Sequence, residues 1–319
     1  MPRASRPLSE ALAGPSPGQG PGPGAVILDG GLSNQLAAQG CDLSGALWTG
    51  RVLAERPEQV AAAHAAYARA GAQVLITASY QVGYAAFARH GHGPERTTAL
   101  LRRSVRLAAR AAREADHEVW VAASVGPYGA VLADGSEYRG RYGLSVRELA
   151  DFHRPRVQAL LAEGPDVLAL ETIPDAVEAR ALLAVLEETG ARAWLSYTVA
   201  DGLTRAGGSQ AEAFALAAGS PQVIAVGVNC CAPGEVLPAL EAAADVTGKP
   251  LVAYPNDGSV WEPATGTWRS PAAEPPWPTA DWLRAGARLV GGCCRIGPHR
   301  IAALAALASP APPSGPERA

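Results

Sequence analysis

The sequence has little positive charge and no long apolar run. It carries 27 lysine and arginine residues against 30 aspartates and glutamates, and its formal net charge is −3. This balance gives no reason to expect a nucleic acid or an anionic membrane as a partner. No uninterrupted apolar stretch reaches the roughly 18 residues of a transmembrane helix, and the amino terminus lacks the apolar core of a signal peptide.

Cysteine is scarce, and its arrangement argues against disulfides. Four of the five cysteines form two adjacent pairs, 230–231 and 293–294, and sequence neighbours cannot readily reach disulfide geometry. No C-x-x-C is present, so a redox dithiol is not expected. Free paired cysteines without an export signal point to a cytoplasmic protein.

The two ends of the chain differ from its middle. Residues 1–24 end in PSPGQGPGPG, a segment that cannot pack a core, although Pro7–Ala13 is expected to form a short helix against the body of the protein. The tail 309–319 is again rich in proline. We therefore expect one domain over 25–308, a length that suits a single α/β barrel.

Within 25–308, short apolar runs alternate with stretches rich in alanine, leucine, glutamate and arginine. The runs are almost continuously apolar, as is typical of parallel strands covered on both faces. The predicted strands are 25–31, 72–79, 119–126, 167–172, 192–199, 223–230, 251–256 and 288–294. The predicted helices are 58–70, 95–116, 145–163, 175–189, 209–218, 234–246 and 298–308, with a weaker pattern at 279–286.

Eight such units in one chain predict a closed (β/α)8 barrel, the TIM barrel. A doubly wound open sheet is the main alternative. No G-x-G-x-x-G opens a helix after the first predicted strand, which weighs against that alternative.

Polar or reactive residues finish every apolar run, where a barrel places its active site. Three long connections, 32–57, 127–144 and 257–278, fall on the same face. They carry aromatic residues that we expect to cover the site: Trp48, Tyr128, Tyr138, Tyr142, Trp261 and Trp268. The residues at the strand ends are Asp29, Ser79, Ser124, Glu171, Thr198, Cys230, Asn256, and Cys293 with Cys294.

Thiols from the two cysteine pairs can converge on zinc at this face. Both members of a pair can bind one metal only where the strand has ended, and Gly291 and Gly292 permit that before the second pair. We therefore expect one ligand from the first pair and both Cys293 and Cys294 from the second, with the fourth position open. A closed structural zinc site and cysteines that merely pack in the core are the alternatives.

An open zinc site of three sulfurs has a direct chemical use. A substrate thiol that takes the fourth position loses its proton and becomes a nucleophile at neutral pH. This chemistry indicates alkyl transfer to sulfur.

The chain resembles the homocysteine S-methyltransferases, in their small zinc-dependent branch. The resemblance runs from LDGGLSNQL (28–36) to GGCCRIGP (291–298) and includes GVNC (227–230), LETIP (170–174) and YPN (254–256). It implies zinc on Cys230, Cys293 and Cys294, with Cys231 outside the ligand set. It also implies that Asp29 and Glu171 hold the amino group of homocysteine, and that backbone amides near Gly30 and Gly31 receive the carboxylate.

The chain departs from the family pattern at two places. Ile296 stands where a threonine usually follows GGCC, and YPNDGS (254–259) replaces the usual YPNSGE, so that Asp257 and Ser259 exchange polarity. Three further residues are candidates beside the substrate. Trp48 and Tyr80 are expected to enclose a sulfonium by cation–π contact, or to pack in loops, and Asn229 is expected beside the metal ligand.

Together these observations predict a zinc enzyme that moves a methyl group from a sulfonium donor to homocysteine, giving methionine. S-methylmethionine ranks above S-adenosylmethionine as the donor, since no glycine-rich adenosine-binding turn is visible. Alternatives are a selenocysteine or selenohomocysteine acceptor and, in another class, a zinc- or thiol-sensing protein. We expect small-molecule substrates, no nucleic acid or membrane partner, and a monomer or small homo-oligomer.

Overall fold

The computed structural model describes residues 4, 6–13, 25–262, 267–271 and 275–308. Its centre is a sheet of eight parallel strands in the order β1-β12-β9-β8-β5-β4-β3-β2. A parallel bridge between Leu28 and Val74 joins the two edges, so the sheet closes into a barrel. The strands are β1 (Val26–Ile27), β2 (Val74–Ile76), β3 (Trp120–Val125), β4 (Val167–Ile173), β5 (Ala193–Tyr197), β8 (Val223–Asn229), β9 (Leu251–Tyr254) and β12 (Ala287–Val290).

The predicted barrel is confirmed, and each of the eight predicted strands overlaps an observed one. Because successive side chains of a strand point to opposite faces, the strands supply two cores. Trp120 and Trp194 belong to the core inside the barrel, whereas their neighbours Val121 and Leu195 belong to the core between strands and helices. Apolar side chains on both faces explain the near-continuous apolar runs of the sequence.

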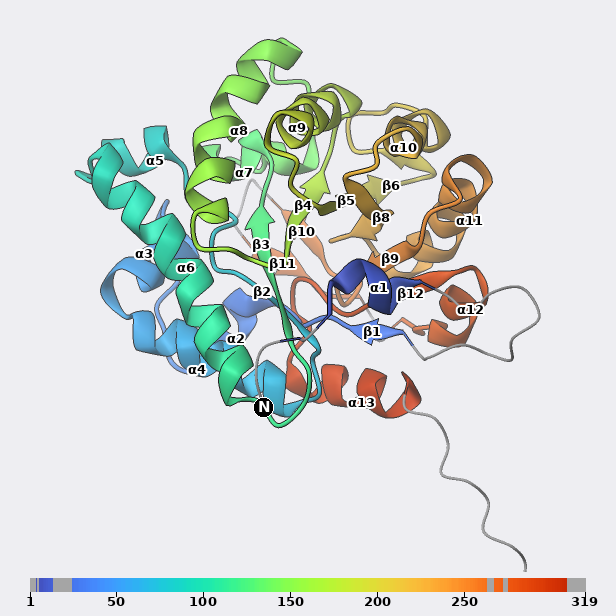
Figure 1. Ribbon diagram of the computed structural model, residues 1–319, viewed down its shortest axis with the longest axis horizontal. Helices are drawn as coiled ribbons and strands as arrows, with labels where there is room; N and C mark the ends of the chain where they lie inside the picture. Colours follow the sequence, from blue (N-terminus) through green and yellow to red (C-terminus); the bar gives the residue numbers. More distant parts are fainter. Residues whose placement is uncertain (1–3, 5, 14–24, 263–266, 272–274, 309–319) are drawn as a thin grey trace, which may run out of the picture.

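The expected helices form the outer ring of the molecule in Figure 1. Polar side chains fix several of their starts; for example, Ser145 and Glu148 form a reciprocal capping box at the start of α8. Among the described residues, no helix is both long and apolar enough to cross a membrane. The ring consists of α4 (Pro57–Arg69), α6 (Pro94–Glu114), α8 (Val146–Leu161), α9 (Ala176–Thr189), α10 (Gln210–Ala218), α11 (Val236–Thr247), α12 (Thr279–Arg284) and α13 (Pro298–Ala308).

The segments between the barrel strands and the outer helices contain short elements that the sequence analysis did not predict. Each is a helix of eight residues or fewer or a strand of three residues or fewer, so it has too few positions to show a hydrophobic period. Their positions bring several side chains over the carboxyl ends of the strands. They are α2 (Leu32–Ala38), α3 (Trp48–Glu55), α5 (Tyr84–Arg89), α7 (Tyr128–Leu132), the 3-10 turns η1 (Ser136–Tyr138) and η2 (Pro233–Glu235), and the hairpins β6 (Val199–Ala200)–β7 (Leu203–Thr204) and β10 (Val260–Glu262)–β11 (Thr267–Arg269).

A short helix before the barrel closes its other end, as the sequence predicted for Pro7–Ala13. Helix α1 (Leu8–Leu12) places the buried side chains of Leu8 and Leu12 in the core inside the barrel. Just before this helix, the carbonyl oxygen of Arg6 accepts a hydrogen bond of 2.9 Å from the Trp120 indole. Helix α1 therefore lies at the amino ends of the strands.

Candidate metal and substrate site

Three of the five cysteines meet at the carboxyl end of the barrel. The sulfur atoms of Cys230, Cys293 and Cys294 all lie within 4.8 Å of one another, and those of Cys230 and Cys294 are 3.5 Å apart. The first follows β8 and the other two follow β12, which is separated from β8 by β9 in the sheet. The structure therefore brings together the three residues that the sequence selected.

The backbone decides which cysteine of the first pair reaches the cluster. Cys230 has φ 51°, in the left-handed region, so the chain turns sharply as β8 ends. Cys231, the next residue, instead packs in the core between strands and helices, where burial raises the pKa of its thiol. The two neighbours thus have separate environments, one reactive and one apolar.

The second pair follows a turn that glycine makes possible. A Cβ atom on Gly292 would lie 2.2 Å from the side chain of Ile296, and one on Gly291 would lie 2.5 Å from Leu28 Cβ. The Gly292 amide donates to the carbonyl oxygen of Asp29 over 3.1 Å. This close approach holds the last strand end against the first.

The donor set and its spacing fit a soft tetrahedral metal ion. Zn–S bonds of about 2.3 Å place two sulfurs about 3.8 Å apart in a tetrahedral site, close to the separations observed here. Hydrogen bonds from the thiols of Cys293 and Cys294 lower the pKa of Cys230, so the cluster favours a thiolate, the form that binds metal.

Two polar side chains contact these sulfurs. The Tyr138 hydroxyl lies 3.2 Å from Cys230 Sγ, and the Asn229 amide nitrogen lies 3.9 Å from Cys293 Sγ. The sequence analysis named Tyr138 only as a covering aromatic residue. A tyrosine in a loop carries no local signal of such a contact, because η1 and β8 are brought together only by the fold.

Asn229 holds neighbouring strand ends together. It is fully buried, its Oδ1 accepts from the Thr172 amide (2.7 Å) and the Ser196 hydroxyl (2.9 Å), and its Nδ2 donates to Thr172 Oγ1 (2.7 Å). It is not among the described residues that line the cavity. Its expected place beside the metal ligands agrees with this geometry better than direct contact with a substrate does.

Two buried carboxyl groups lie in the same cavity as the thiols. Asp29 Oδ2 accepts from the Ile76 amide (2.9 Å), while Asp29 Oδ1 is buried and no described group donates a hydrogen bond to it. Glu171 accepts hydrogen bonds from the hydroxyls of Ser124 and Tyr254. Burial raises the pKa of both carboxyl groups, that of Glu171 to about 7.

A chain of buried polar groups extends from Glu171. Its Oε2 accepts from the Tyr254 hydroxyl (3.1 Å), which is 2.7 Å from the Ser196 hydroxyl, and the Ser196 hydroxyl donates to Asn229 Oδ1 over 2.9 Å. The hydrogen bonds from Ser124 and Tyr254 lower the pKa of Glu171, but the effect of burial is larger. Desolvation of the carboxylate is therefore the main cause of its raised pKa.

A cavity of about 650 Å³ joins these groups. It is lined by Trp48 and Tyr80, as expected, and also by Glu137, which the sequence analysis did not select. The side chains of Trp261 and Trp268 lie outside the described part of the structure. Of the ten residues predicted as metal ligands or as neighbours of the substrate or metal, all but Asn229 line the cavity: Asp29, Gly30, Gly31, Trp48, Tyr80, Glu171, Cys230, Cys293 and Cys294.

The Gly31 amide does not fit the expectation of a free donor for a carboxylate. It donates to the Ile296 carbonyl oxygen over 2.8 Å, and the Tyr67 hydroxyl contacts the same oxygen at 2.9 Å. A Cβ atom on Gly30 would lie 2.3 Å from that oxygen, so glycine is required there for close packing. The Gly31 amide therefore already has an acceptor within the protein.

The departures from the family pattern have local structural partners. Asp257 forms an ion pair of 2.8 Å with Arg295, the residue after the last cysteine, and accepts from the Ser259 amide (2.9 Å). The Ile296 side chain is buried against Gly292. These residues shape the turn beside the cysteines and are not among the described residues that line the cavity.

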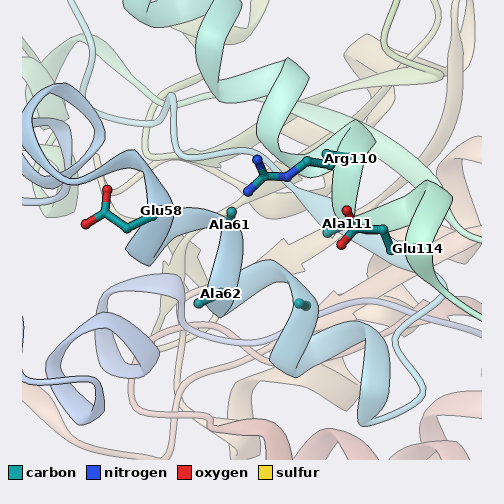
Figure 2. A pocket seen from close by; sticks show the side chains of 7 residues that line it. Glu58, Ala61, Ala62, Arg110, Ala111 and Glu114 are labelled. Carbon is teal, nitrogen blue, oxygen red and sulfur yellow. The ribbon is translucent and has the colours of Figure 1, made fainter.

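A second hollow lies on the outside of the molecule, between α4 and α6 (Figure 2). It encloses about 240 Å³ and is lined mostly by alanines, with Glu58, Arg110 and Glu114 around them. It contains neither a thiol nor a buried carboxylate.

Comparison with known proteins agrees with the arrangement at the barrel mouth. The family model described as homocysteine S-methyltransferase matches residues 26–308. The homocysteine S-methyltransferase of Escherichia coli K12 is 46% identical over 88% of this chain and 94% of its own length, and YbgG of Bacillus subtilis is 40% identical over 89% and 94%. A selenocysteine Se-methyltransferase of Brassica oleracea is 38% identical over 88% of both chains.

A solved structure shows the same likeness in three dimensions. The metallated form of the homocysteine methyltransferase MmuM from Escherichia coli is 43% identical, covers 89% of this chain and 96% of that chain, and superposes with a TM-score of 0.80. The span that the family model matches, residues 26–308, includes the whole barrel and all three clustered cysteines. By fold, by site and by sequence, this chain belongs to the homocysteine S-methyltransferase family.

Proposed function

We propose that this protein transfers a methyl group from a sulfonium donor to the thiol of L-homocysteine and so forms methionine. The observation that carries the proposal is the meeting of three thiols and two buried carboxyl groups in one cavity. The family supports the same reaction.

The three thiols of Cys230, Cys293 and Cys294 would hold zinc. Zinc held there would supply a positive charge that favours the ionised form of a substrate thiol. The Tyr138 hydroxyl contacts Cys230 Sγ and the Asn229 amide donates to Cys293 Sγ, so both residues help to orient the sulfurs. The relative MmuM has a metallated form, and three sulfur ligands favour zinc among the common metals.

Asp29 and Glu171 would bind the ammonium group of homocysteine. Asp29 Oδ1 receives no hydrogen bond from the described residues, and an ammonium group would supply the donor. The nearby positive charge also favours ionised Glu171. The substrate carboxylate would then lie at the turn of Gly30 and Gly31, against the first amides of α2, which have no acceptor within the helix.

The methyl group would come from a cationic sulfur. Trp48 and Tyr80 line the cavity and can face such a cation, an interaction worth about 0.5–2 kcal/mol. The chain's contribution to the rate is alignment of the two sulfurs in a site that excludes water. We rank S-methylmethionine above S-adenosylmethionine as the donor.

The test is methionine formation by the purified, zinc-loaded protein. Homocysteine is supplied with S-methylmethionine, S-adenosylmethionine or betaine, and kcat/KM is compared among the donors. We expect turnover with the two sulfonium donors and the higher value for S-methylmethionine. No methionine with either sulfonium would overturn the proposal.

A seleno-amino acid is the second candidate acceptor, favoured by the relative named selenocysteine Se-methyltransferase. The three-thiol site suits a selenolate as well as a thiolate, because both are soft. Competition between homocysteine and selenocysteine at equal concentration separates the two. We expect homocysteine to give the higher kcat/KM.

A further inference from the structure

Glu137 is a carboxylate in the cavity wall for which the reaction proposed above leaves no role. It belongs to η1 and precedes Tyr138, whose hydroxyl contacts Cys230 Sγ at 3.2 Å. Its Oε2 atom is buried, and no described group donates a hydrogen bond to it. Burial raises the pKa of Glu137 to about 7, as expected of a carboxylate that lacks a positive partner.

The charges around the cavity indicate what that partner is. Among its described lining residues there is no lysine, arginine or histidine, but there are four acidic ones. Asp29 and Glu171 are assigned to the acceptor, and Asp134 is exposed and accepts from the Ser136 amide. Glu137 is therefore the acidic group left for a second cation.

The second substrate brings such a cation. A sulfonium amino acid carries one more positive charge than homocysteine or methionine, and a permanent charge in a dry cavity needs an anion nearby. The donor sulfur must approach the thiol cluster for the methyl group to pass, and η1 lies against that cluster through Tyr138 and Cys230.

We propose that Glu137 pairs with the sulfonium charge of the methyl donor and so selects a cationic donor over its neutral product. This inference rests on the proposed function and assigns the donor side of the same site. Once the methyl group has moved, neither sulfur is positive, so the pairing is lost. Glu137 thus binds the donor more tightly than methionine and favours exchange after turnover.

The test is equilibrium binding to the zinc-loaded protein without homocysteine, so that no reaction occurs. Calorimetry measures the Kd of S-methylmethionine and of methionine for the wild type and for Glu137→Gln, which removes the charge but keeps the shape. We expect the Kd of S-methylmethionine to rise about tenfold or more and that of methionine to stay within about twofold. S-adenosylmethionine serves as a second sulfonium probe and should lose affinity as well.

Glu163→Gln is the matched control, because it removes one negative charge at a surface ion pair with Arg106. It should change neither Kd. Zinc content and the unfolding transition confirm that Glu137→Gln is folded, and Glu137→Asp should weaken sulfonium binding less than Glu137→Gln does.

Two results would overturn this role of Glu137. One is an unchanged Kd for both sulfoniums in Glu137→Gln; the other is an equal loss for methionine, which would mean that Glu137 binds the ammonium group instead. Either result leaves the proposed reaction intact if the wild type forms methionine. Absence of turnover in the wild type would count against the reaction itself.

Discussion

The two ends of this barrel are built from the same eight strands and have opposite character. At the amino ends, Leu8 and Leu12 of α1 pack into an apolar interior that includes Trp120 and Trp194. At the carboxyl ends, buried carboxyl groups and thiols line a cavity. At the amino ends, burial of apolar side chains stabilises the fold. At the carboxyl ends, burial of polar atoms costs free energy, and a ligand that hydrogen-bonds to them would reduce this cost.

The comparison shows how to separate structural from functional polar residues at a barrel mouth. Ser79 donates to the Ser124 carbonyl oxygen (2.7 Å), and Asn256 Oδ1 accepts from the Gly258 amide (2.8 Å), so both have a structural use. Asp29 and Glu137 instead each keep a buried oxygen to which none of the described residues donates. An unsatisfied buried atom is the better mark of a substrate contact.

The largest effect is expected from breaking the thiol cluster. Cys294→Ala should lose bound zinc and reduce kcat/KM about a thousandfold or more, since even outer partners of a metal site cost about 10–100-fold. The barrel should still unfold cooperatively, because the cores lie elsewhere. Metal analysis and thermal unfolding check this, with Cys231→Ala as the control that keeps its zinc. Full zinc in Cys294→Ala would rule out this ligand.

A substitution at the amino ends of the strands should instead lower stability and leave zinc binding and activity unchanged. Leu12→Ala removes a side chain that is 1% exposed and should lower the free energy of unfolding by about 2–5 kcal/mol. Zinc content and kcat/KM should stay close to those of the wild type. Urea unfolding measures the loss, and Ser9→Ala on the same helix is the control. A stability unchanged by Leu12→Ala would mean that α1 does not close the barrel.

The buried carboxyl groups at the carboxyl ends of the strands should make the stability of the metal-free protein depend on pH. The folded state holds the proton of Glu171 up to about pH 7, whereas the unfolded state releases it near 4.5. Between these values the folded state binds more protons, so stability falls as pH rises, by at most about 3 kcal/mol for this group. Glu171→Gln should remove that part of the slope in metal-free protein and should be the more stable protein at pH 8.

Unfolding of both proteins between pH 4.5 and 8 gives the comparison. Parallel curves would show that Glu171 is not protonated in the folded state. The same variant should lose activity with homocysteine, because a neutral amide cannot pair with the ammonium group.

A smaller loss is expected when the charge of Asp29 alone is removed. Asp29→Asn keeps an acceptor for the Ile76 amide but loses the charge, and kcat/KM for homocysteine should fall by the equivalent of about 1.5–3 kcal/mol. Zinc content should not change, and the exposed Asp116→Asn is the control. Unaltered kinetics would assign Asp29 to the turn alone.

The smallest effect concerns the ion pair beside the cysteines. Asp257→Ser restores the residue usual in the family and breaks the 2.8 Å contact with Arg295, whose side chain is partly exposed. The free energy of unfolding should fall by less than about 1 kcal/mol. A larger loss, or a loss of zinc, would show that the pair holds the turn after Cys294.

The sequence by itself determined the barrel and most of its site. Eight apolar runs, each followed by a helical pattern, leave few ways to cover both faces of every strand, so the eight barrel strands could be located closely. Parallel strands also present their carboxyl ends at one face, and this alone predicts that Asp29, Glu171 and Cys230 lie near one another, as they do in the cavity. Local periodicity and strand direction are properties of the chain alone.

Only the tertiary structure decided which polar atoms are left without partners. Glu137 and Tyr138 lie in a 3-10 turn too short for a periodic pattern, and their contacts come from elements distant in sequence. The occupied Gly31 amide, bonded to a residue 265 positions later, was equally invisible in the sequence. Hydrogen bonding and burial depend on packing between elements. Local sequence patterns therefore do not predict the surroundings of Glu137 and Tyr138, the residues of the proposed donor side.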